Sequence, residues 1–155
     1  MKIKLLVMDV DGTLTDGRIY IGADGEVMKA FDVRDGYGIK HILPRHGVVP
    51  VIITGRRSAI VERRCAELDI TELHQGVGDK LAKLRELAEK YGLTSGEIAY
   101  IGDDVNDIAC MRYAGFSACP ADALDEVRSY ADYVCRFSGG RGAVRELVDR
   151  ITADE

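Results

Sequence analysis

Residues 3–13 constrain the fold of this chain more than any other stretch. An apolar run ends at Met8 and is followed by two aspartates one residue apart, Asp9 and Asp11, and by a Gly-Thr pair. Such a run is typical of a buried strand in a parallel sheet, and open parallel sheets bind ligands beyond the carboxyl ends of their strands. Alternate residues of an extended segment share a face, so both carboxylates can face one ligand. Two like charges this close need a cation, a hydrogen-bond donor or a proton between them. The alternative to a ligand site is a solvated loop that happens to contain two aspartates.

Strands and helices alternate along the rest of the chain, which predicts an α/β fold with a doubly wound, Rossmann-like parallel sheet. Three of the predicted strands end in polar clusters, which begin at Asp9, Thr54 and Asp103. The carboxyl ends of parallel strands share one edge of a sheet, so we expect these clusters to converge. Because the chain has no linker, repeat or low-complexity segment, we expect residues 1–155 to form a single domain. The predicted strands are residues 3–8, 48–53, 71–74, 97–101, 115–118 and 131–134, and the predicted helices are residues 35–46, 58–68, 79–91, 108–113, 122–129 and 143–151.

Residues 17–33 are expected to form a β-hairpin inserted between the first strand and the first helix. Two β-rich arms flank a turn that contains Asp24 and Gly25. The insertion leaves the sheet at the same edge as Asp9, and Asp35 is expected to cap the helix that follows. A lone two-stranded ribbon is marginal in water and can bury only one face against its own domain, so we expect the hairpins of several subunits to pack together. In the alternative, the hairpin folds back on its own domain.

The charge balance limits the partners of the chain. It carries 21 basic and 26 acidic residues, a net charge of −5, which disfavours nucleic acid as the main partner. No apolar stretch reaches the length of a membrane span and no signal peptide is visible, so we expect no membrane contact. The four cysteines are scattered without a C-x-x-C pair, which favours reduced, packed thiols and a cytoplasmic location.

The polar side chains at the predicted edge suit a hard cation and a phosphate. Carboxylate oxygens are the ligands that Mg²⁺ prefers, together with water and a substrate phosphate, and no soft-metal ligand set is visible. A carboxylate nucleophile can attack phosphorus once a metal ion and a lysine neutralise charge on the phosphoryl group. A second carboxylate, that of Asp11, would protonate the leaving oxygen and later activate water. The acidic group comprises Asp9, Asp11, Asp103, Asp104 and Asp107, and the phosphate-holding group comprises Thr54, Gly55 and Lys80.

Residues 9–13, Thr54, Lys80 and residues 102–107 resemble, in order, the four motifs of the haloacid dehalogenase-like phosphatases. The resemblance spans most of the chain and implies that Asp9 is the nucleophile, forming an aspartyl-phosphate, with Asp11 as general acid and base. It also implies that Mg²⁺ is bound by the Asp9 and Asp103 carboxylates and by the Asp11 backbone carbonyl. The other residues that it assigns are Thr54 and Lys80 in catalysis, and Asp104 and Asp107 in support of the metal and of Lys80.

Five segments, residues 9–17, 31–38, 54–56, 75–76 and 139–146, resemble a narrower group, the 3-deoxy-D-manno-octulosonate 8-phosphate phosphatases, which act in lipopolysaccharide biosynthesis. Members of this group lack a cap domain and form tetramers in which the hairpin of one subunit covers a neighbour's site. The resemblance implies a capless haloacid dehalogenase-like fold and a free-standing phosphatase that hydrolyses a sugar-acid phosphate.

The choice of sugar acid depends on one position. Relatives that act on nonulosonate 9-phosphates, those of KDN or N-acetylneuraminate, tend to carry Glu after Thr-Gly, where this chain has Arg56. The eight-carbon 8-phosphate is therefore the expected substrate, and the nine-carbon 9-phosphates are the alternative. A guanidinium suits a carboxylate or a phosphate, so Arg56 and Arg64 are expected to bind substrate, together with Gly55 and Asn106. The alternative for these arginines is a solvated helix face.

Two other classes of protein use related chemistry. A phosphoacceptor signalling module, such as a response-regulator receiver, also combines an Asp cluster, Thr, Lys and Mg²⁺. Its acidic pair belongs to the first strand, whereas Asp103 and Asp104 come late in this chain. A phosphomutase with the same aspartyl-phosphate needs a cap to hold its bisphosphate intermediate, and the chain has no sequence for a cap. The phosphatase is therefore the preferred interpretation.

Overall fold

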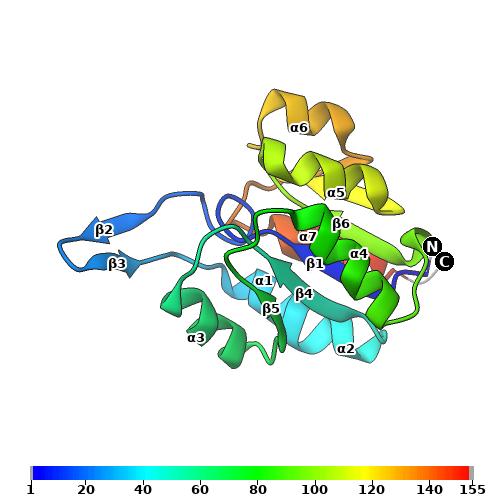
Figure 1. Cartoon of the computed structure of the whole chain (residues 1–155), viewed down its shortest axis with the longest axis horizontal. Helices are drawn as coiled ribbons and strands as arrows, with labels where there is room; N and C mark the ends of the chain where they lie inside the picture. Colours follow the sequence, from blue (N-terminus) through cyan, green and yellow to red (C-terminus); the bar gives the residue numbers. More distant parts are fainter. Residues whose placement is uncertain (1, 154–155) are drawn as a thin grey trace.

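The computed structural model describes residues 2–153 and contains a six-stranded, wholly parallel sheet (Figure 1). The strand order is β5-β4-β1-β6-β7-β8. Numbered by their order within this sheet, the strands run 3-2-1-4-5-6, whereas the receiver fold runs 2-1-3-4-5, so the order argues against the signalling module. The strands are β1 (Leu5–Met8), β4 (Val49–Ile53), β5 (Glu72–His74), β6 (Ile98–Ile101), β7 (Phe116–Cys119) and β8 (Tyr133–Val134).

Helices cover both faces of the sheet, as the doubly wound prediction requires. Leu6 and Met8 of β1 belong to the core beneath the helical residues 33–45, 59–67 and 143–151, whereas Leu5 and Val7 belong to the core beneath the helical residues 80–90, 108–113 and 125–130. This alternation follows from the pleat of a strand that is buried on both sides. The helical segments are α1 (Val33–Tyr37), the π-helical η1 (Gly38–Ile42), α2 (Leu43–Arg45), α3 (Ala59–Glu67), α4 (Lys80–Lys90), η2 (Ser95–Glu97), η3 (Val105–Asp107), α5 (Ile108–Tyr113), α6 (Asp125–Tyr130) and α7 (Ala143–Ile151). Among the described residues, no helix is both long and apolar enough to cross a membrane.

The hairpin formed by β2 (Tyr20–Gly22) and β3 (Gly25–Met28) projects away from the sheet (Figure 1). Its apolar side chains face solvent in the single chain, with Ile21 65% exposed and Val27 63% exposed. The alternative in which the hairpin folds back on its own domain is therefore wrong. No cap domain accompanies it among residues 2–153.

The first predicted helix differs from the structure in its cap and in its regularity. Asp32, not Asp35, caps α1, because its side chain accepts a hydrogen bond from the backbone N–H of Arg34. The predicted helix over 35–46 is broken by the π-helical turn of η1. Asp35 is buried instead, and its Oδ1 accepts a hydrogen bond of 2.9 Å from the backbone N–H of Arg145 in the first turn of α7. Packing against α7 buries Asp35, and Asp32 caps the helix in its place.

The glycine-rich segment 139–142 packs against the loop that follows β1. The backbone N–H of Gly140 donates to the carbonyl of Thr13 at 3.0 Å. A Cβ at Gly139 would lie 1.9 Å from the carbonyl oxygen of Gly12, so only glycine permits this approach. The segment thus supports the loop that carries Asp11.

Candidate active site

The switch point of the sheet lies between β1 and β6, and it brings together the carboxylates that follow these strands. Oxygens of Asp9, Asp103 and Asp107 lie within 4.8 Å of one another. Gly12, with a φ of +90°, makes room for this cluster, because a Cβ there would lie 1.9 Å from Oδ2 of Asp103. The hydroxyl of Thr13 donates to Oδ1 of Asp103 at 3.3 Å. The predicted convergence of the first and last motifs is confirmed by this geometry.

Lys80 enters the same cluster from the opposite side. It is the first residue of α4, whose cap Asp79 accepts a hydrogen bond from the backbone N–H of Ala82. Its Nζ lies 2.9 Å from Oδ1 of Asp9 and 2.9 Å from Oδ1 of Asp107. The lysine is buried, and although burial alone would lower its pKa, the two carboxylates outweigh burial and raise it.

Asp107 is the hub that organises the cluster. Its Oδ1 accepts hydrogen bonds from Lys80 and, at 2.5 Å, from the hydroxyl of Tyr100. Its Oδ2 accepts from the backbone N–H groups of Asp103 and Asp104 at 3.1 and 3.2 Å. Both oxygens are already engaged, so Asp107 fits a supporting role better than direct metal ligation. Sequence reasoning missed Tyr100, whose only signal is a hydroxyl in the middle of a fully apolar strand.

The remaining acidic residue of this loop stays at the surface. Asp104 is exposed, and its Oδ1 accepts a hydrogen bond of 2.7 Å from the backbone N–H of Val105 at the start of η3. Asn106 lies in η3 with an exposed side chain. Both residues are therefore exposed to solvent in the segment between Asp103 and Asp107.

Two carboxyl groups of the cluster, those of Asp9 and Asp103, have pKa values raised above the ordinary value of aspartate. Burial raises the pKa of Asp9, the charge of Asp107 adds to this, and Lys80 opposes it. Burial, together with Asp9 and Asp107, raises the pKa of Asp103 to about 8. One ammonium thus shares the space with more carboxylate charge than it can balance, and hard oxygen donors suit a small divalent cation such as Mg²⁺.

Asp11 lies beside this cluster and is held by a lysine that sequence reasoning missed. Oδ1 of Asp11 accepts a hydrogen bond of 2.6 Å from Nζ of Lys29, the residue that follows β3. The same Nζ lies 3.5 Å from Oε2 of Glu26. The side chain of Lys29 is 0% exposed, and that of Asp11 is 20% exposed. A lone lysine at the base of a hairpin is too common a pattern to single out.

Glu26 in turn connects the hairpin to the predicted phosphate-binding segment. Its Oε2 accepts hydrogen bonds from Nε and Nη2 of Arg56 at 3.2 and 2.8 Å, and its Oε1 accepts from the hydroxyl of Ser58 at 2.6 Å. Arg56 is therefore at the catalytic edge, with 45% of its side chain exposed. Thr54 is buried at the end of β4, and Gly55 after it is exposed.

Arg64 is the predicted substrate-binding residue that the structure places elsewhere. Its guanidinium lies over the ring of Phe31, 5.5 Å from the centroid, and its Nη1 donates to Glu67 at 3.2 Å. Its Nη2 is 3.5 Å from the carbonyl oxygen of Asp32. Among residues 2–153, Arg64 makes no hydrogen bond or ion pair with the clustered carboxylates, so its role in substrate binding stays a prediction.

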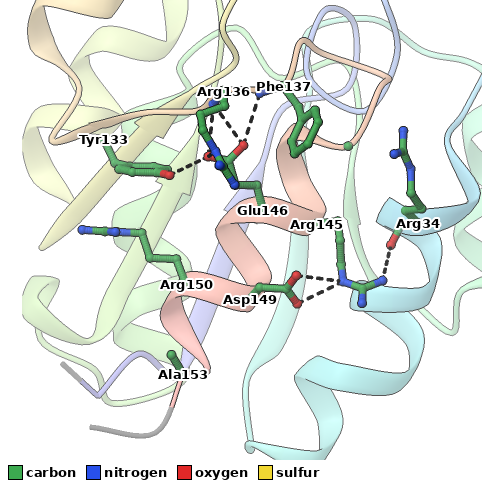
Figure 2. A pocket seen from close by; sticks show the side chains of 10 residues that line it. Arg34, Tyr133, Arg136, Phe137, Arg145, Glu146, Asp149, Arg150 and Ala153 are labelled. Atoms are coloured by element: carbon green, nitrogen blue, oxygen red, sulfur yellow. Dashed lines mark hydrogen bonds and ion pairs between the residues drawn. The ribbon is translucent and has the colours of Figure 1, made fainter.

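A separate cavity of about 560 Å³ lies along α7 and contains no predicted site residue (Figure 2). Its charges are satisfied locally. Nε of Arg145 donates to Asp149 at 3.0 Å, and Arg150 stacks over Tyr133 at 4.3 Å from the ring centroid. The chemistry therefore belongs to the sheet edge and not to this cavity.

The fold and the cluster together define a class. An Asp-x-Asp-Gly-Thr strand end, a buried lysine and an acidic loop meet at the switch point of a 3-2-1-4-5-6 sheet. A family model described as haloacid dehalogenase-like hydrolase matches residues 65–147. The chain belongs to the haloacid dehalogenase-like hydrolases.

Within this family, the chain is similar to several 3-deoxy-D-manno-octulosonate 8-phosphate phosphatases. It is 50% identical over 147 residues to the enzyme KdsC of Escherichia coli K12, covering 95% of this chain and 78% of that protein. The Yersinia pestis enzyme has a solved structure that is 48% identical with a TM-score of 0.93, covering 96% of this chain and 80% of that one. A Moraxella catarrhalis structure, in complex with magnesium, phosphate and KDO, is 44% identical with a TM-score of 0.92, covering 96% and 85% of the two chains.

Proposed function

We propose that this chain is a Mg²⁺-dependent phosphatase that hydrolyses 3-deoxy-D-manno-octulosonate 8-phosphate through an aspartyl-phosphate. The observation that carries the proposal is the contact of one buried lysine, Lys80, with Asp9 and Asp107, beside an Asp103 whose pKa is raised to about 8. This is a cluster prepared for a cation and a phosphoryl group. The high identity to KdsC supports the choice of substrate.

Asp9 and Asp11 divide the chemistry between them. An oxygen of the Asp9 carboxylate attacks phosphorus, the bond from phosphorus to the sugar oxygen breaks, and that oxygen takes a proton from the Asp11 carboxyl group. The Asp11 carboxylate then takes a proton from water, whose oxygen attacks the phosphorus of the aspartyl-phosphate. Inorganic phosphate leaves, the Asp9 carboxylate is restored and Asp11 regains its proton.

The carboxylates of Asp9 and Asp103, with the backbone carbonyl of Asp11, would hold Mg²⁺. The bound ion would supply positive charge to the phosphate oxygens. Lys80 neutralises the charge of Asp9 from the buried side, and Asp107 keeps the lysine and the 103–104 backbone in place. Thr54 and the backbone of Gly55 would bind phosphate oxygens.

The test is phosphate release from 3-deoxy-D-manno-octulosonate 8-phosphate, measured beside the 9-phosphates of KDN and N-acetylneuraminate, with Mg²⁺ and with excess chelator. We expect the eight-carbon substrate to be turned over with the highest kcat/KM and chelator to abolish turnover. Higher kcat/KM on a 9-phosphate would favour the alternative nonulosonate phosphatase, and full activity in chelator would refute the metal requirement.

Arg56 tests the basis of this preference. We propose that it contacts the sugar acid or its phosphate, since its guanidinium lies at the catalytic edge with nearly half of the side chain exposed. Arg56→Glu should lower kcat/KM on the 8-phosphate more than on the 9-phosphates. An equal fall on both would make Arg56 a general anion contact.

We also propose a homotetramer in which hairpins complete neighbouring sites. The support is the exposed apolar surface of a hairpin that leaves the domain at the catalytic edge. Light scattering should give about four times the chain mass of 17.0 kDa. Charged residues in place of Ile19 and Ile21 should reduce both assembly and turnover, and a fully active monomer would end this proposal. The four cysteines are free and buried, which supports the further proposal of a cytoplasmic location.

A further inference from the structure

Lys29 is the most unusual charged residue outside the predicted motifs. Its side chain is 0% exposed, although lysine is almost never fully buried unless it is paired. Removing an ammonium from water costs several kcal/mol, which has to be offset by close partners of opposite charge. The partners are Oδ1 of Asp11 at 2.6 Å and Oε2 of Glu26 at 3.5 Å. A buried ammonium is thus in direct contact with the carboxylate proposed as acid and base.

We propose that Lys29 is a positioning residue that holds the Asp11 carboxylate in the orientation needed for proton transfer. The inference rests on the proposed role of Asp11 and goes beyond it. Because Oδ1 of Asp11 is committed to Lys29, the other oxygen, Oδ2, is the one left to face the leaving oxygen of the substrate. Within residues 2–153, that second oxygen accepts no hydrogen bond. The lysine therefore selects which oxygen carries the proton.

Lys29 is itself held from behind by a chain of contacts. Glu26 faces the ammonium and is fixed by two further groups, the guanidinium of Arg56 and the hydroxyl of Ser58. Both partners of Glu26 lie in the segment after β4, so strand β3 of the hairpin is tied to the domain through Glu26. All of these contacts form within one chain.

The geometry favours positioning over direct substrate binding. A group that binds substrate has to be open to it, whereas the Lys29 side chain is fully enclosed and Asp11 keeps 20% of its side-chain surface open. Substrate can therefore reach Asp11 while the lysine stays behind it. Its influence on the reaction passes through Asp11.

This arrangement predicts a dependence on the leaving group. A sugar or glycerol oxygen leaves as a strongly basic alkoxide unless it is protonated, so a misplaced Asp11 slows phosphoryl transfer from alkyl phosphates. The p-nitrophenolate ion is a weak base that leaves without protonation. Its kcat/KM, which reports steps up to the first phosphoryl transfer, should depend little on the orientation of Asp11.

The experiment compares Lys29→Met with the unmodified enzyme on three phosphates. These are 3-deoxy-D-manno-octulosonate 8-phosphate, glycerol 3-phosphate, which lacks a carboxylate, and p-nitrophenyl phosphate. We expect kcat/KM to fall about 10- to 100-fold on both alkyl phosphates and less than about threefold on the aryl phosphate. Because Asp11 also activates water in the second step, stopped-flow traces of Lys29→Met with the aryl phosphate should show a burst of p-nitrophenolate.

One further variant and one control decide what a failure means. Lys29→Arg keeps a cationic donor and should recover part of the activity on the alkyl phosphates. Lys83→Met removes a lysine of α4 that does not contact Asp11, and it should leave the ratio of kcat/KM on each alkyl phosphate to that on the aryl phosphate unchanged. An equal fall on all three phosphates would make Lys29 a structural residue, and a fall on the sugar acid alone would make it a ligand of the carboxylate. Either result overturns the inference.

Asp11→Asn separates this inference from the proposed function. If Asp11→Asn itself leaves the alkyl-to-aryl ratio unchanged, the assignment of Asp11 as the acid fails. If Asp11→Asn shifts the ratio and Lys29→Met does not, only the role of Lys29 fails. Thermal unfolding of each variant shows whether Lys29→Met is folded, and Lys29→Gln, which keeps a neutral donor, replaces it if it is not.

Discussion

Two buried lysines stand at the catalytic edge of the sheet, and they are carried by different parts of the molecule. Lys80 is the first residue of α4 and bridges Asp9 to Asp107. Asp107 also accepts a hydrogen bond from the hydroxyl of Tyr100. Tyr100 and Asp107 are both 0% exposed, and burial keeps the pKa of Tyr100 well above its ordinary value. The Lys80 cluster is therefore part of the sheet core.

The Lys29 cluster repeats this arrangement on the projecting hairpin. Lys29 bridges Asp11 to Glu26, and Glu26 also accepts the hydroxyl of Ser58. Both clusters contain the same four groups in the same order of contact. An aspartate of the first motif contacts a lysine, the lysine contacts a supporting carboxylate, and that carboxylate accepts a hydrogen bond from a hydroxyl. Here, however, the supporting carboxylate belongs to β3, whose apolar side chains are exposed.

The difference teaches how the two catalytic roles are supported. Asp9, the proposed nucleophile, is held by groups whose positions follow from the packing of the sheet. Asp11, the proposed acid and base, is held by a hairpin that projects from the sheet. Disturbing the hairpin should therefore affect proton transfer and leave the nucleophile intact. The predictions below test this division, beginning with the largest expected effect.

The first prediction removes the group that the Lys80 cluster serves. Asp9→Asn should lower kcat by about four orders of magnitude or more, because the attacking oxygen is gone. Phosphate release measures the rate, and circular dichroism checks that the fold is kept. A turnover close to that of the unmodified enzyme would show that the Lys80 cluster does not serve a nucleophile at Asp9.

The second prediction compares the lysines by stability. Lys80→Met leaves two buried carboxylates without a counter-charge and should lower the free energy of unfolding by about 3–5 kcal/mol. Lys29→Met should cost less, because the partly exposed Asp11 regains water and Glu26 keeps Arg56. Urea unfolding midpoints measure both. An equal or larger loss for Lys29→Met would contradict the assignment of the two clusters to core and hairpin.

The third prediction removes one hydroxyl from each cluster. Tyr100→Phe and Ser58→Ala should each cost about 1 kcal/mol of stability, the first through a lost hydrogen bond and the second through a lost cap of α3. Tyr100→Phe should lower kcat about tenfold, because it loosens Asp107 and hence Lys80. Ser58→Ala should lower it only about two- to threefold, since Arg56 still holds Glu26. Steady-state kinetics decide, and the reverse order would break the comparison.

The fourth prediction uses a buried carboxylate that pairs with no lysine among residues 2–153. Burial raises the pKa of Asp35 to about 6, while a hydrogen bond from the backbone of Arg145 opposes the rise, and its Oδ2 has no partner. The folded state therefore binds this proton more tightly than the unfolded state. Stability should fall as the pH rises from about 4 to about 6 and then level off.

Asp35→Asn keeps the acceptor for Arg145 and removes this titration. Relative to the unmodified chain, the variant should gain stability on the order of 3 kcal/mol between pH 4 and pH 7, with kcat unchanged at neutral pH. Unfolding midpoints at several pH values measure the effect. If the midpoints of the unmodified chain and of Asp35→Asn change with pH in parallel, the prediction is wrong, and burial of the Asp35 carboxylate does not lower stability.

The sequence by itself determined the parallel sheet, the convergence of Asp9 and Asp103, the approach of Lys80 and the hairpin. These follow from local patterns, because apolar runs define strands, polar clusters mark their ends, and parallel strands place those ends at one edge. The side chains involved sit directly at strand or helix termini. Their meeting therefore needs no knowledge of how distant surfaces pack.

Only the tertiary structure decided the contacts that hold these groups. Lys29 on Asp11, Tyr100 on Asp107 and Asp35 on the start of α7 each join elements whose relative placement depends on packing. The sequence predicts that Arg64 binds substrate, but its guanidinium lies over the ring of Phe31. Lysine, tyrosine and arginine are common residues, so their types alone carry no signal of these partners. A charged or hydroxyl group gains its role when burial removes water and leaves one partner within reach.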